Sequence, residues 1–465
     1  MKKSTALLLL VMLLLAASSV HAAEQVDVVV IGAGGGGLAA AVSAAENGAS
    51  VVVVEKMPFI GGNTMLSTGA FYAGSSLLHA GLDAAIPAGN IAQTLLRSAD
   101  GTANESLVRF LAAESGNTIN WLETMGVEFL SMTGIALANN GGAGVVLPLA
   151  AAAEQRGVRT LLETQATSLI MDSGRVVGIV VEDGQGQISE IHAKAVVIAT
   201  GGFAANRDMV REHKPDFADL PITCHVGAVG DGIVMAQEVG AALVDLDKVM
   251  PVPTADAETG RVITAMMRGA AGASILVNEA GQRFSDETTL YEPLTYIVLD
   301  ELDQQELPYV FQMFDHTAVQ NVPIASVYVD SGVAVQADTV SELAVLLGID
   351  QAALEETVEQ YNAAIAAGDE DEFGRTTALR ALEEAPFYAM KVMPGLLATR
   401  GGLVFNQQAQ VLSTEGTAIP GLYAAGETTG GIFGSGYQGG AFLTVALTFG
   451  RIAGTQAAIT ALTNP

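Results

Sequence analysis

Residues 28–37 read VVVIGAGGGG, and this stretch decides the fold class. The β-branched run at 28–31 is typical of a buried parallel strand, and the glycines after it predict a tight turn. Residues 38–47 are rich in alanine and predict a helix, after which residues 51–54, VVVV, predict a second buried strand. The order strand, turn, helix, strand predicts a βαβ unit and therefore an α/β fold.

The glycines of this turn also carry a nucleotide fingerprint. Gly32, Gly34 and Gly37 match the pattern GxGxxG. Its first glycine allows the turn, its second lets the backbone approach a pyrophosphate, and its third lets helix and strand pack closely. Glu55 ends the second strand, near where an acid accepts the ribose hydroxyls. We therefore expect a bound dinucleotide, the alternative being a glycine-rich turn without a ligand.

The rest of the chain alternates between apolar, glycine-rich stretches and more polar, acidic ones. Residues 147–155 predict a helix, residues 172–174 and 183–184 predict hairpin turns, and residues 196–202, VVIATGG, predict another buried strand with a glycine turn. Residues 351–367 form an acidic amphipathic stretch, and the C-terminal part is again apolar and rich in glycine. We expect a Rossmann-like nucleotide-binding domain built from both ends of the chain, with an inserted α+β capping domain. The expected boundaries are 1–22 for a signal peptide, 23–240 and 386–465 for the nucleotide-binding domain, and 241–385 for the insert.

Composition excludes several classes of protein. The 465 residues carry a formal charge of −29, from 21 basic and 50 acidic residues, so nucleic acid is not an expected partner. The single cysteine, Cys224, excludes an internal disulfide, a CxxC redox pair and a CxxCH haem attachment. The six histidines are scattered, so no metal site is expected.

The N-terminus reads as a targeting segment. Lys2 and Lys3 precede an apolar run at residues 6–17, followed by SSVHA at 18–22. The run is shorter than the ~20 residues of a bilayer span, and the small residues after it suit a signal peptidase. We expect a cleaved Sec-type signal and an exported, periplasmic protein without a transmembrane segment; an uncleaved anchor is the alternative.

The chain resembles the flavoproteins of the fumarate reductase and succinate dehydrogenase family. The resemblance is collinear over essentially the whole mature chain. Its motifs here are GGNT (61–64), STGAF (67–71), ATGGF (199–203), GDG (230–232), APFYA (385–389), GLYAAGE (421–427), GG (439–440) and TFGR (448–451).

The resemblance implies FAD as the cofactor. Family positions that hold FAD correspond here to Glu55, Asn63, Thr64, Asp231 and Glu427. The neighbouring positions expected to contact it are Lys56, Gly62, Ser67, Gly69, Thr200, Gly201 and Gly440. For the acids the alternative is loop capping. No histidine follows in the flavin loop, so we expect noncovalent FAD.

The positions that hold the substrate depart from the soluble fumarate reductases. Those enzymes clamp a dicarboxylate with two histidines and two arginines. In this chain the histidine segments read VPT (252–254) and LATRGG (397–402), and the arginine positions are Tyr291 and Tyr437. The family's proton relay of Glu and Arg reads Ala265 and Arg268. A doubly charged substrate would be poorly held, because a buried carboxylate is unfavourable without a cationic partner.

Tyrosine at both arginine positions resembles the 3-ketosteroid dehydrogenase branch of the same superfamily. There, one tyrosine exchanges a proton at the carbon α to a ketone, and the other polarises the ketone oxygen. A tyrosine serves as a base only if its pKa, near 10 in water, is lowered. Arg400 or Arg268 is the candidate cation for that role. The alternative for Tyr291 and Tyr437 is a structural tyrosine.

The leading hypothesis is therefore an exported FAD-dependent oxidoreductase. It transfers hydride between flavin N5 and a C–C bond next to a carbonyl, with a small carbonyl-conjugated substrate. One rival is a periplasmic respiratory reductase of a small unsaturated carboxylate, with Arg400 and Arg268 as its clamp. A second rival is a flavin-binding partner without catalysis. Because this chain has no haem motif, the expected electron partner is a separate cytochrome or quinone-linked carrier.

Overall fold

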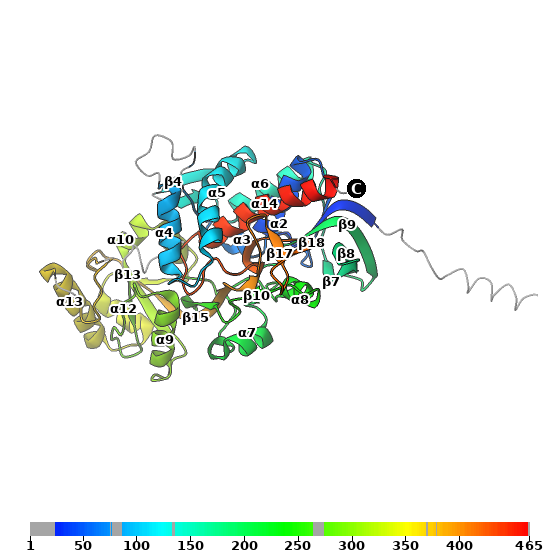
Figure 1. Ribbon diagram of the computed structural model, residues 1–465. Coiled ribbons are helices and arrows are strands. Elements are labelled where there is room, and N and C mark those ends of the chain that lie inside the picture. Colours follow the sequence, from blue (N-terminus) through cyan, green and yellow to red (C-terminus); the bar gives the residue numbers. More distant parts are fainter. Residues whose placement is uncertain are drawn as a thin grey trace, which may run out of the picture. The chain divides into compact units, whose positions relative to one another are not determined.

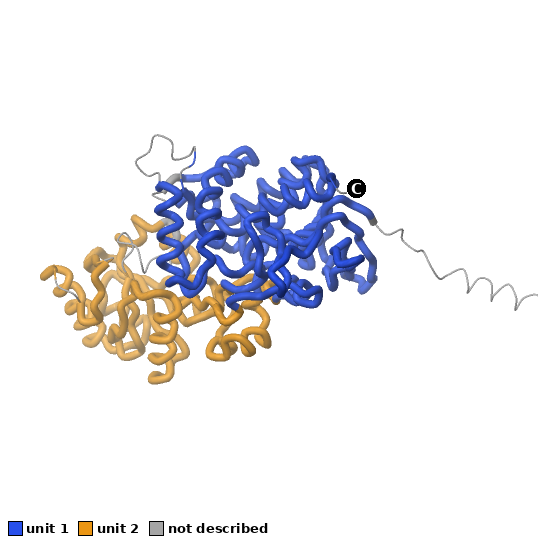
Figure 2. Tube along the Cα trace, in the orientation of Figure 1, with its two compact units in different colours: residues 1–202, 230–245, 400–465 blue, residues 203–229, 246–399 orange. Residues whose placement is uncertain are grey.

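The computed structural model describes residues 24–74, 76, 86–132, 135–263, 274–368, 371–377 and 379–463. The predicted signal peptide lies outside them. The chain divides into two compact units, shown in separate colours in Figure 2. Unit 1 comprises Met1–Gly202, Gly230–Asp245 and Arg400–Pro465, and unit 2 comprises Phe203–Val229 and Leu246–Thr399.

Unit 1 is built on an eight-stranded sheet whose central strands are parallel. β1 (Glu24–Ile31) pairs with β2 (Val51–Val54) on one side and with β9 (Ile188–Ile198) on the other. The C-terminal β18 (Ala418–Ala424) joins β9 in parallel, so both ends of the chain contribute to one sheet. The remaining strands are β6 (Arg159–Leu161), β7 (Thr164–Asp172), β8 (Arg175–Asp183) and β17 (Gln410–Leu412). The expected α/β fold class is confirmed.

Two helices pack closely against each other beside this sheet. α2 (Gly35–Glu46) follows β1, and α14 (Ala441–Thr463) follows the C-terminal strand and lies alongside α2 (Figure 1). The approach is possible because glycines face the other helix: a Cβ on Gly454 would lie 2.1 Å from the Ala40 carbonyl oxygen. α14 also contacts β9 and β18, so the two helices lie against each other and against the sheet, with α2 following the glycine turn.

α14 is also the one helix among the described residues that is long and apolar enough to cross a membrane. Its most apolar window is 61% buried inside the protein. Phe449, Ala453 and Ala457 are fully buried in the core that α14 shares with α2. This packing is that of a core helix.

Further elements of unit 1 complete the scaffold of the site. They are α3 (Gly62–Leu66), β3 (Ala70–Tyr72), α4 (Ala88–Ser98), α5 (Glu105–Thr124), β4 (Phe129–Met132), β5 (Ile135–Ala138), α6 (Ala143–Gln155), α8 (Asp231–Glu238), β10 (Leu243–Val244), β16 (Gly402–Leu403) and η4 (Gly426–Thr428). β3, β5 and β4 form a small antiparallel sheet.

Unit 2 is an α+β unit around an antiparallel sheet. The sheet runs β11 (Val249–Asp256), β15 (Phe387–Thr399), β13 (Val310–Asp315), β12 (Ser274–Val277), with β14 (Val335–Ala337) also paired to β15. Because side chains alternate along a strand, the sheet buries both faces: Leu276 of β12 packs in one core and Ile275 in the other. The helices are α7 (Arg207–His213), η2 (Pro215–Phe217), α9 (Tyr291–Leu302), α10 (His316–Asn321), α11 (Pro323–Asp330), α12 (Val340–Leu347) and α13 (Gln351–Ala367).

The boundaries of the two compact units differ from the expected domain boundaries. Residues 203–229, expected in the nucleotide-binding domain, belong to unit 2 because Thr223 N–H donates to the Leu396 carbonyl and Leu396 N–H to that of Pro221. Residues 386–399 belong there too, since β15 pairs along its length with β11 and β13.

Candidate functional site

The glycine turn between β1 and α2 is as tight as its residue types imply. Gly32 has φ +100°, and a Cβ there would lie 2.5 Å from the Ala199 carbonyl oxygen. A Cβ on Gly37 would lie 1.9 Å from the Gly32 carbonyl oxygen. The turn, the start of α2 and the end of β9 thus approach at backbone distance, which a side chain at either position would prevent.

The N-terminus of α2 is suited to an anion. Its N-cap, Gly34, has no side chain to cap the first N–H groups, and the first turn holds no acidic residue. Gly35 N–H donates to the Thr64 hydroxyl at 3.2 Å, which joins α2 to the loop after β2. The first turn of a helix presents N–H groups and the positive end of its dipole, which together attract phosphate.

Glu55 lies beside this turn, at the end of β2. Its carboxylate accepts hydrogen bonds from Ala33 N–H at 2.8 Å and from Met57 N–H at 2.9 Å. These two bonds orient the side chain, and an ionised carboxylate has about four acceptor sites. The remaining sites suit the hydroxyls of a ribose.

An ion pair joins the GDG element to the residue that follows Glu55. Asp231 opens α8, and its carboxylate lies 2.6 Å from Lys56 Nζ, just after Glu55. Thr200 belongs to the second glycine turn, in which Gly201 has φ +78°. Among the described residues the buried Thr200 hydroxyl finds no hydrogen-bond partner. A buried polar atom of this kind is one that a ligand satisfies.

The flavin-side loop is joined to the C-terminal GLYAAGE motif. Asn63 Nδ2, in α3, donates to the Glu427 carboxylate at 2.8 Å. Ser67 donates to the Thr64 carbonyl oxygen at 2.7 Å and accepts from Gly69 N–H at 3.2 Å, which closes the loop on itself. Gly62, Gly69 and Gly440 all have positive φ.

All fifteen residues predicted to bind the cofactor lie in unit 1, although they come from its three separate chain segments. The residues fit FAD. They provide an uncapped helix N-terminus for the pyrophosphate, a carboxylate at the ribose position, a buried hydroxyl without a protein partner, and an amide–carboxylate pair beside the flavin loop.

Tyr437 lies in the same unit, within an aromatic cluster. Its ring centroid is 6.0 Å from that of Phe433 and 4.9 Å from that of Phe442. Its hydroxyl oxygen accepts a hydrogen bond from Gly440 N–H at 3.2 Å. A phenol O–H can donate to a carbonyl oxygen and polarise it, which is the role predicted for Tyr437.

Tyr291 lies in unit 2, as the first residue of α9. The next residue, Glu292, pairs with Lys214 at 2.8 Å, and Tyr296 one turn further donates to Asp216 at 2.9 Å. Burial acts to lower the pKa of Lys214, but the pairing with Glu292 outweighs it and raises that pKa. The start of α9 is thus tied to the segment that contains α7 and η2.

Of the two candidate cations, Arg400 lies among the described residues. Arg400 follows β15, belongs to unit 1 and is 4% exposed. Arg268, like Ala265, lies outside the described residues. The grouping of these arginines with Tyr291 and Tyr437 in one active site stays a prediction.

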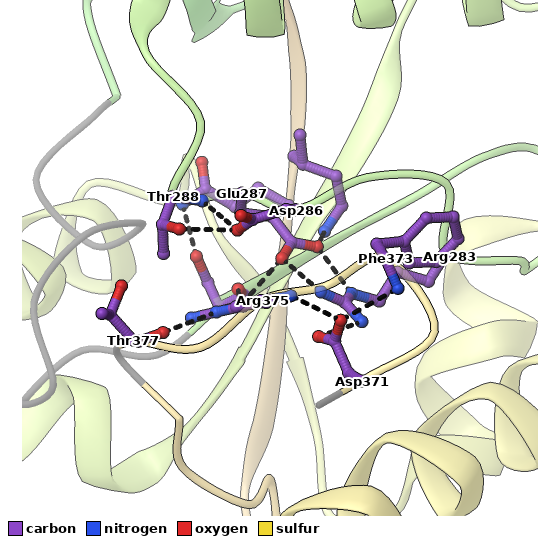
Figure 3. Close-up of polar contacts among 11 residues, drawn as sticks. Arg283, Asp286, Glu287, Thr288, Asp371, Phe373, Arg375 and Thr377 are labelled. Atoms are coloured by element: carbon purple, nitrogen blue, oxygen red, sulfur yellow. Dashed lines mark hydrogen bonds and ion pairs between the residues drawn. The ribbon is translucent and has the colours of Figure 1, made fainter. Parts of the chain in front are cut away.

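One charged cluster was not predicted from the sequence. Four side chains of unit 2, Arg283, Glu287, Asp371 and Arg375, form a buried ion network (Figure 3). Arg283 and Glu287 lie in a GxRFxxE pattern visible in the sequence, whereas Asp371 and Arg375 carry no local motif. No group of three or more potential metal ligands occurs among the described residues.

Comparison with known proteins identifies the family. Residues 27–442 match the family described as FAD binding domain. The chain is 34% identical over 420 residues to an NADH:fumarate oxidoreductase of Klebsiella pneumoniae, covering 87% of this chain and 44% of that protein. It is 31% identical over 367 residues to a 3-oxosteroid 1-dehydrogenase of Mycolicibacterium smegmatis, covering 69% of this chain and 63% of that protein.

A solved structure agrees over the whole fold. A flavocytochrome c3 fumarate reductase in an open conformation superposes with a TM-score of 0.82 and 31% identity, covering 97% of this chain and 81% of that one. The chain spans less than two thirds of the length of the Klebsiella and Mycolicibacterium proteins. It belongs to the family of FAD-binding flavoproteins that includes the fumarate reductases and the 3-oxosteroid dehydrogenases.

Proposed function

We propose that this protein is an exported FAD-dependent oxidoreductase that acts on a C–C bond next to a carbonyl, with a neutral enone or ketone as its substrate. The observation that carries the proposal is the Tyr437 hydroxyl, held by Gly440 N–H in the unit that contains the residues predicted to bind FAD. Bound FAD supplies the hydride acceptor or donor.

The chain's own residues supply the other two parts of such a reaction. Tyr437 donates its O–H to the carbonyl oxygen and stabilises the enolate that develops there. Tyr291, as the phenolate, takes the proton from the carbon α to the carbonyl and becomes a neutral phenol, while the hydride leaves from the β carbon. The products are the enone, a protonated Tyr291 and reduced cofactor, and the reverse sequence reduces an enone.

A second candidate is the reduction of a small unsaturated carboxylate. The buried Arg400 favours it, because a guanidinium binds a carboxylate through two parallel hydrogen bonds. The Klebsiella relative is named for fumarate, which supports the same reading. One arginine suits a monocarboxylate better than a dicarboxylate, since each further buried carboxylate needs its own cation.

The reoxidation of reduced protein separates these candidates. The purified flavoprotein is reduced anaerobically with dithionite and mixed with neutral cyclic enones or with acrylate and fumarate, while flavin absorbance is followed. We expect fast reoxidation by neutral enones. We also expect a loss of roughly 10²-fold or more in the Tyr437→Phe and Tyr291→Phe variants. Tyr309→Phe is the control, because the Tyr309 ring packs on Phe311 in unit 2.

Three other outcomes would each reject part of the proposal. Reoxidation by carboxylates alone would support the carboxylate reductase and reject the tyrosine mechanism. Full activity of Tyr291→Phe would remove that residue from the mechanism. Failure of every acceptor to reoxidise the protein would favour a flavin-binding partner without catalysis.

Export and a separate electron carrier complete the proposal. The N-terminal sequence supports export, and the relative named fumarate reductase (cytochrome) supports a cytochrome or quinone-linked carrier. The flavocytochrome relative couples haem and flavin by its name. Mass spectrometry of protein expressed with its N-terminus tests export: the mature chain should begin at Ala23 or Glu24, and an intact Met1 in protein from the periplasm would contradict cleavage.

A further inference from the structure

The buried ion network of unit 2 connects residues 274–287 with residues 371–377, which lie far apart in the sequence. Its four charged side chains are almost fully excluded from solvent: those of Glu287 and Arg375 are 0% exposed, and those of Arg283 and Asp371 are 2% exposed. Two positive and two negative groups balance. Figure 3 shows them converging between the turn at 283–288 and the segment 371–377.

Glu287 lies at the centre of this network. Its carboxylate accepts from Arg283 Nε and Nη2, both at 2.8 Å, from Arg375 Nη1 at 2.8 Å, and from Leu276 N–H at 2.9 Å. Arg283 alone gives this carboxylate a two-pronged partner. Because Arg283 also pairs with Asp371, Arg375 supplies the second positive charge that balances the two carboxylates.

Arg375 ties the network to two backbone segments. It donates to the Ser274 carbonyl at the start of β12 at 3.0 Å and to the Thr377 carbonyl at 3.2 Å. Asp371 holds the same segment from the other end. Its Oδ1 accepts from the N–H groups of Phe373 and Arg375, and its Oδ2 lies 2.7 Å from Arg283 Nη1.

The network leads directly to Tyr291. Only three residues separate Glu287 from the start of α9, and the turn before them is fixed, since Asp286 accepts from Thr288 N–H and from its hydroxyl. The N-cap of α9, Leu290, has no side-chain cap. An uncapped helix start frays unless other contacts hold it. Here the chain just before α9 is held at Glu287, whose carboxylate is bonded to Arg283, Arg375 and Leu276 N–H, and the first turn is held by the Lys214–Glu292 pair.

We propose that Arg375 and Glu287 are positioning residues that fix the first turn of α9 and thereby the phenol of Tyr291. The inference rests on the proposed function, in which Tyr291 transfers the proton. A buried ion network adds little stability over apolar packing of the same volume, and its best-attested use is to specify one geometry. This network specifies where α9 begins.

A double-mutant cycle tests the inference. Arg375→Lys keeps the charge but cannot reproduce the guanidinium's bonds to Glu287, Ser274 and Thr377. We expect kcat to fall roughly 10- to 100-fold, because misplacing a reacting group by about 1 Å has an effect of that size. We expect KM to change little. In a Tyr291→Phe background the same change should alter kcat less than about twofold. Arg380→Lys, at a partly exposed arginine of unit 2, is the control.

A second readout does not depend on activity. Hydrogen exchange of the peptide that covers residues 288–295 should be faster in Arg375→Lys than in wild type, while that of α5 in unit 1 stays unchanged. Asp371→Asn keeps the bonds to Phe373 and Arg375 N–H and weakens only the contact with Arg283. This variant should disturb the protein less than Arg375→Lys does. It should show the same changes in kcat and in hydrogen exchange at 288–295, to a smaller extent.

The outcomes distinguish this inference from the proposed function. Equal losses of kcat with and without Tyr291, or unchanged exchange at 288–295, would overturn the positioning role. If Tyr291→Phe is itself fully active, the proposed function fails at that residue. The exchange measurement then still decides whether Arg375 holds the start of α9.

Discussion

Gly37 is the residue at which the nucleotide turn has least room. A Cβ there would lie 1.9 Å from the Gly32 carbonyl oxygen, well inside contact distance. Gly37→Ala should therefore push α2 away from the turn. We expect a loss of about 1–3 kcal/mol in the free energy of unfolding, as for other overpacked sites. We also expect several-fold weaker FAD binding, measured by thermal unfolding and by titration of apoprotein with FAD.

Gly89→Ala is the matched control for this change. Gly89 lies in α4 of the same unit, and a Cβ there meets nothing within 4 Å. Alanine is favoured over glycine in a helix by roughly 0.5–1 kcal/mol. The control should thus keep or gain stability and bind FAD as wild type does. A Gly37→Ala protein with normal FAD affinity would show that α2 tolerates the displacement.

Single residues differ in how far the sequence reveals their role. Gly37 and Glu55 could be predicted, because a fixed spacing within one βαβ unit places them together. Arg375 could not be predicted, because its partners Glu287 and Ser274 lie 88 and 101 residues away in the sequence and no local pattern joins them to it. A charged residue in a polar segment normally lies in solvent, so burial of this one has no local signal.

At the scale of elements, Asp27 ties together the three central strands of unit 1. Its carboxylate accepts from Ser50 N–H at 2.9 Å and from the Ser50 hydroxyl at 2.7 Å, just before β2, and lies 3.2 Å from Lys194 Nζ in β9. Burial acts to raise the pKa of Asp27, but the bonds from Ser50 and Lys194 outweigh it and lower that pKa. The ionised carboxylate thus favours the folded state.

The sign of this shift predicts how Asp27→Asn depends on pH. A lowered pKa stabilises the folded protein above the ordinary value of about 3.9, and that contribution disappears as pH falls through the lowered pKa. At pH 7 the variant should be less stable by about 1 kcal/mol or less, since the pair is partly exposed. As the pH falls from 5 to 2, the unfolding free energies of the variant and of wild type, measured by denaturant unfolding, should converge.

Glu182→Gln, at an exposed acid of β8 in the same sheet, is the control for this series. It should follow wild type across the whole pH range. A constant difference between Asp27→Asn and wild type down to pH 2 would mean that Asp27 acts through the shape of its side chain and not through its charge.

Elements with a local signature could be predicted well. α13 spans the amphipathic stretch at 351–367, because Asp350 caps its first turn and Gly368, with φ +70°, ends it. β15 was expected to begin the returning nucleotide-binding domain. Its thirteen residues instead pair with strands of unit 2. A strand's own residues do not reveal which neighbours it joins, since apolar alternation suits either sheet.

At the scale of the whole molecule, each unit is assembled from segments that alternate along the chain. Unit 1 takes three segments and unit 2 takes two. The exchange points lie at glycine turns and short loops. A chain that enters the other unit and returns after 27 residues leaves no long stretch from which a boundary can be predicted, which explains why residues 203–229 were expected in the nucleotide-binding domain.

The charge of the whole chain leads to a prediction about salt. With 50 acidic and 21 basic residues, most acids have no base to pair with, so the average interaction between surface charges is repulsive. Such self-repulsion destabilises the compact state. Salt screens it, because the Debye length falls from about 30 Å at 0.01 M to about 3 Å at 1 M ionic strength. The melting temperature should therefore rise by several degrees as NaCl increases over that range.

Two comparisons separate screening from other effects of salt. KCl should act as NaCl does, since screening depends on ionic strength and not on the identity of a monovalent cation. The Glu287→Gln variant should have a lower melting temperature at every salt concentration but show the same rise with salt. Its network is buried, so salt ions do not screen it. A melting temperature that stays flat or falls with both salts would mean that exposed ion pairs, such as Arg109 with Glu105, contribute more than the repulsion does.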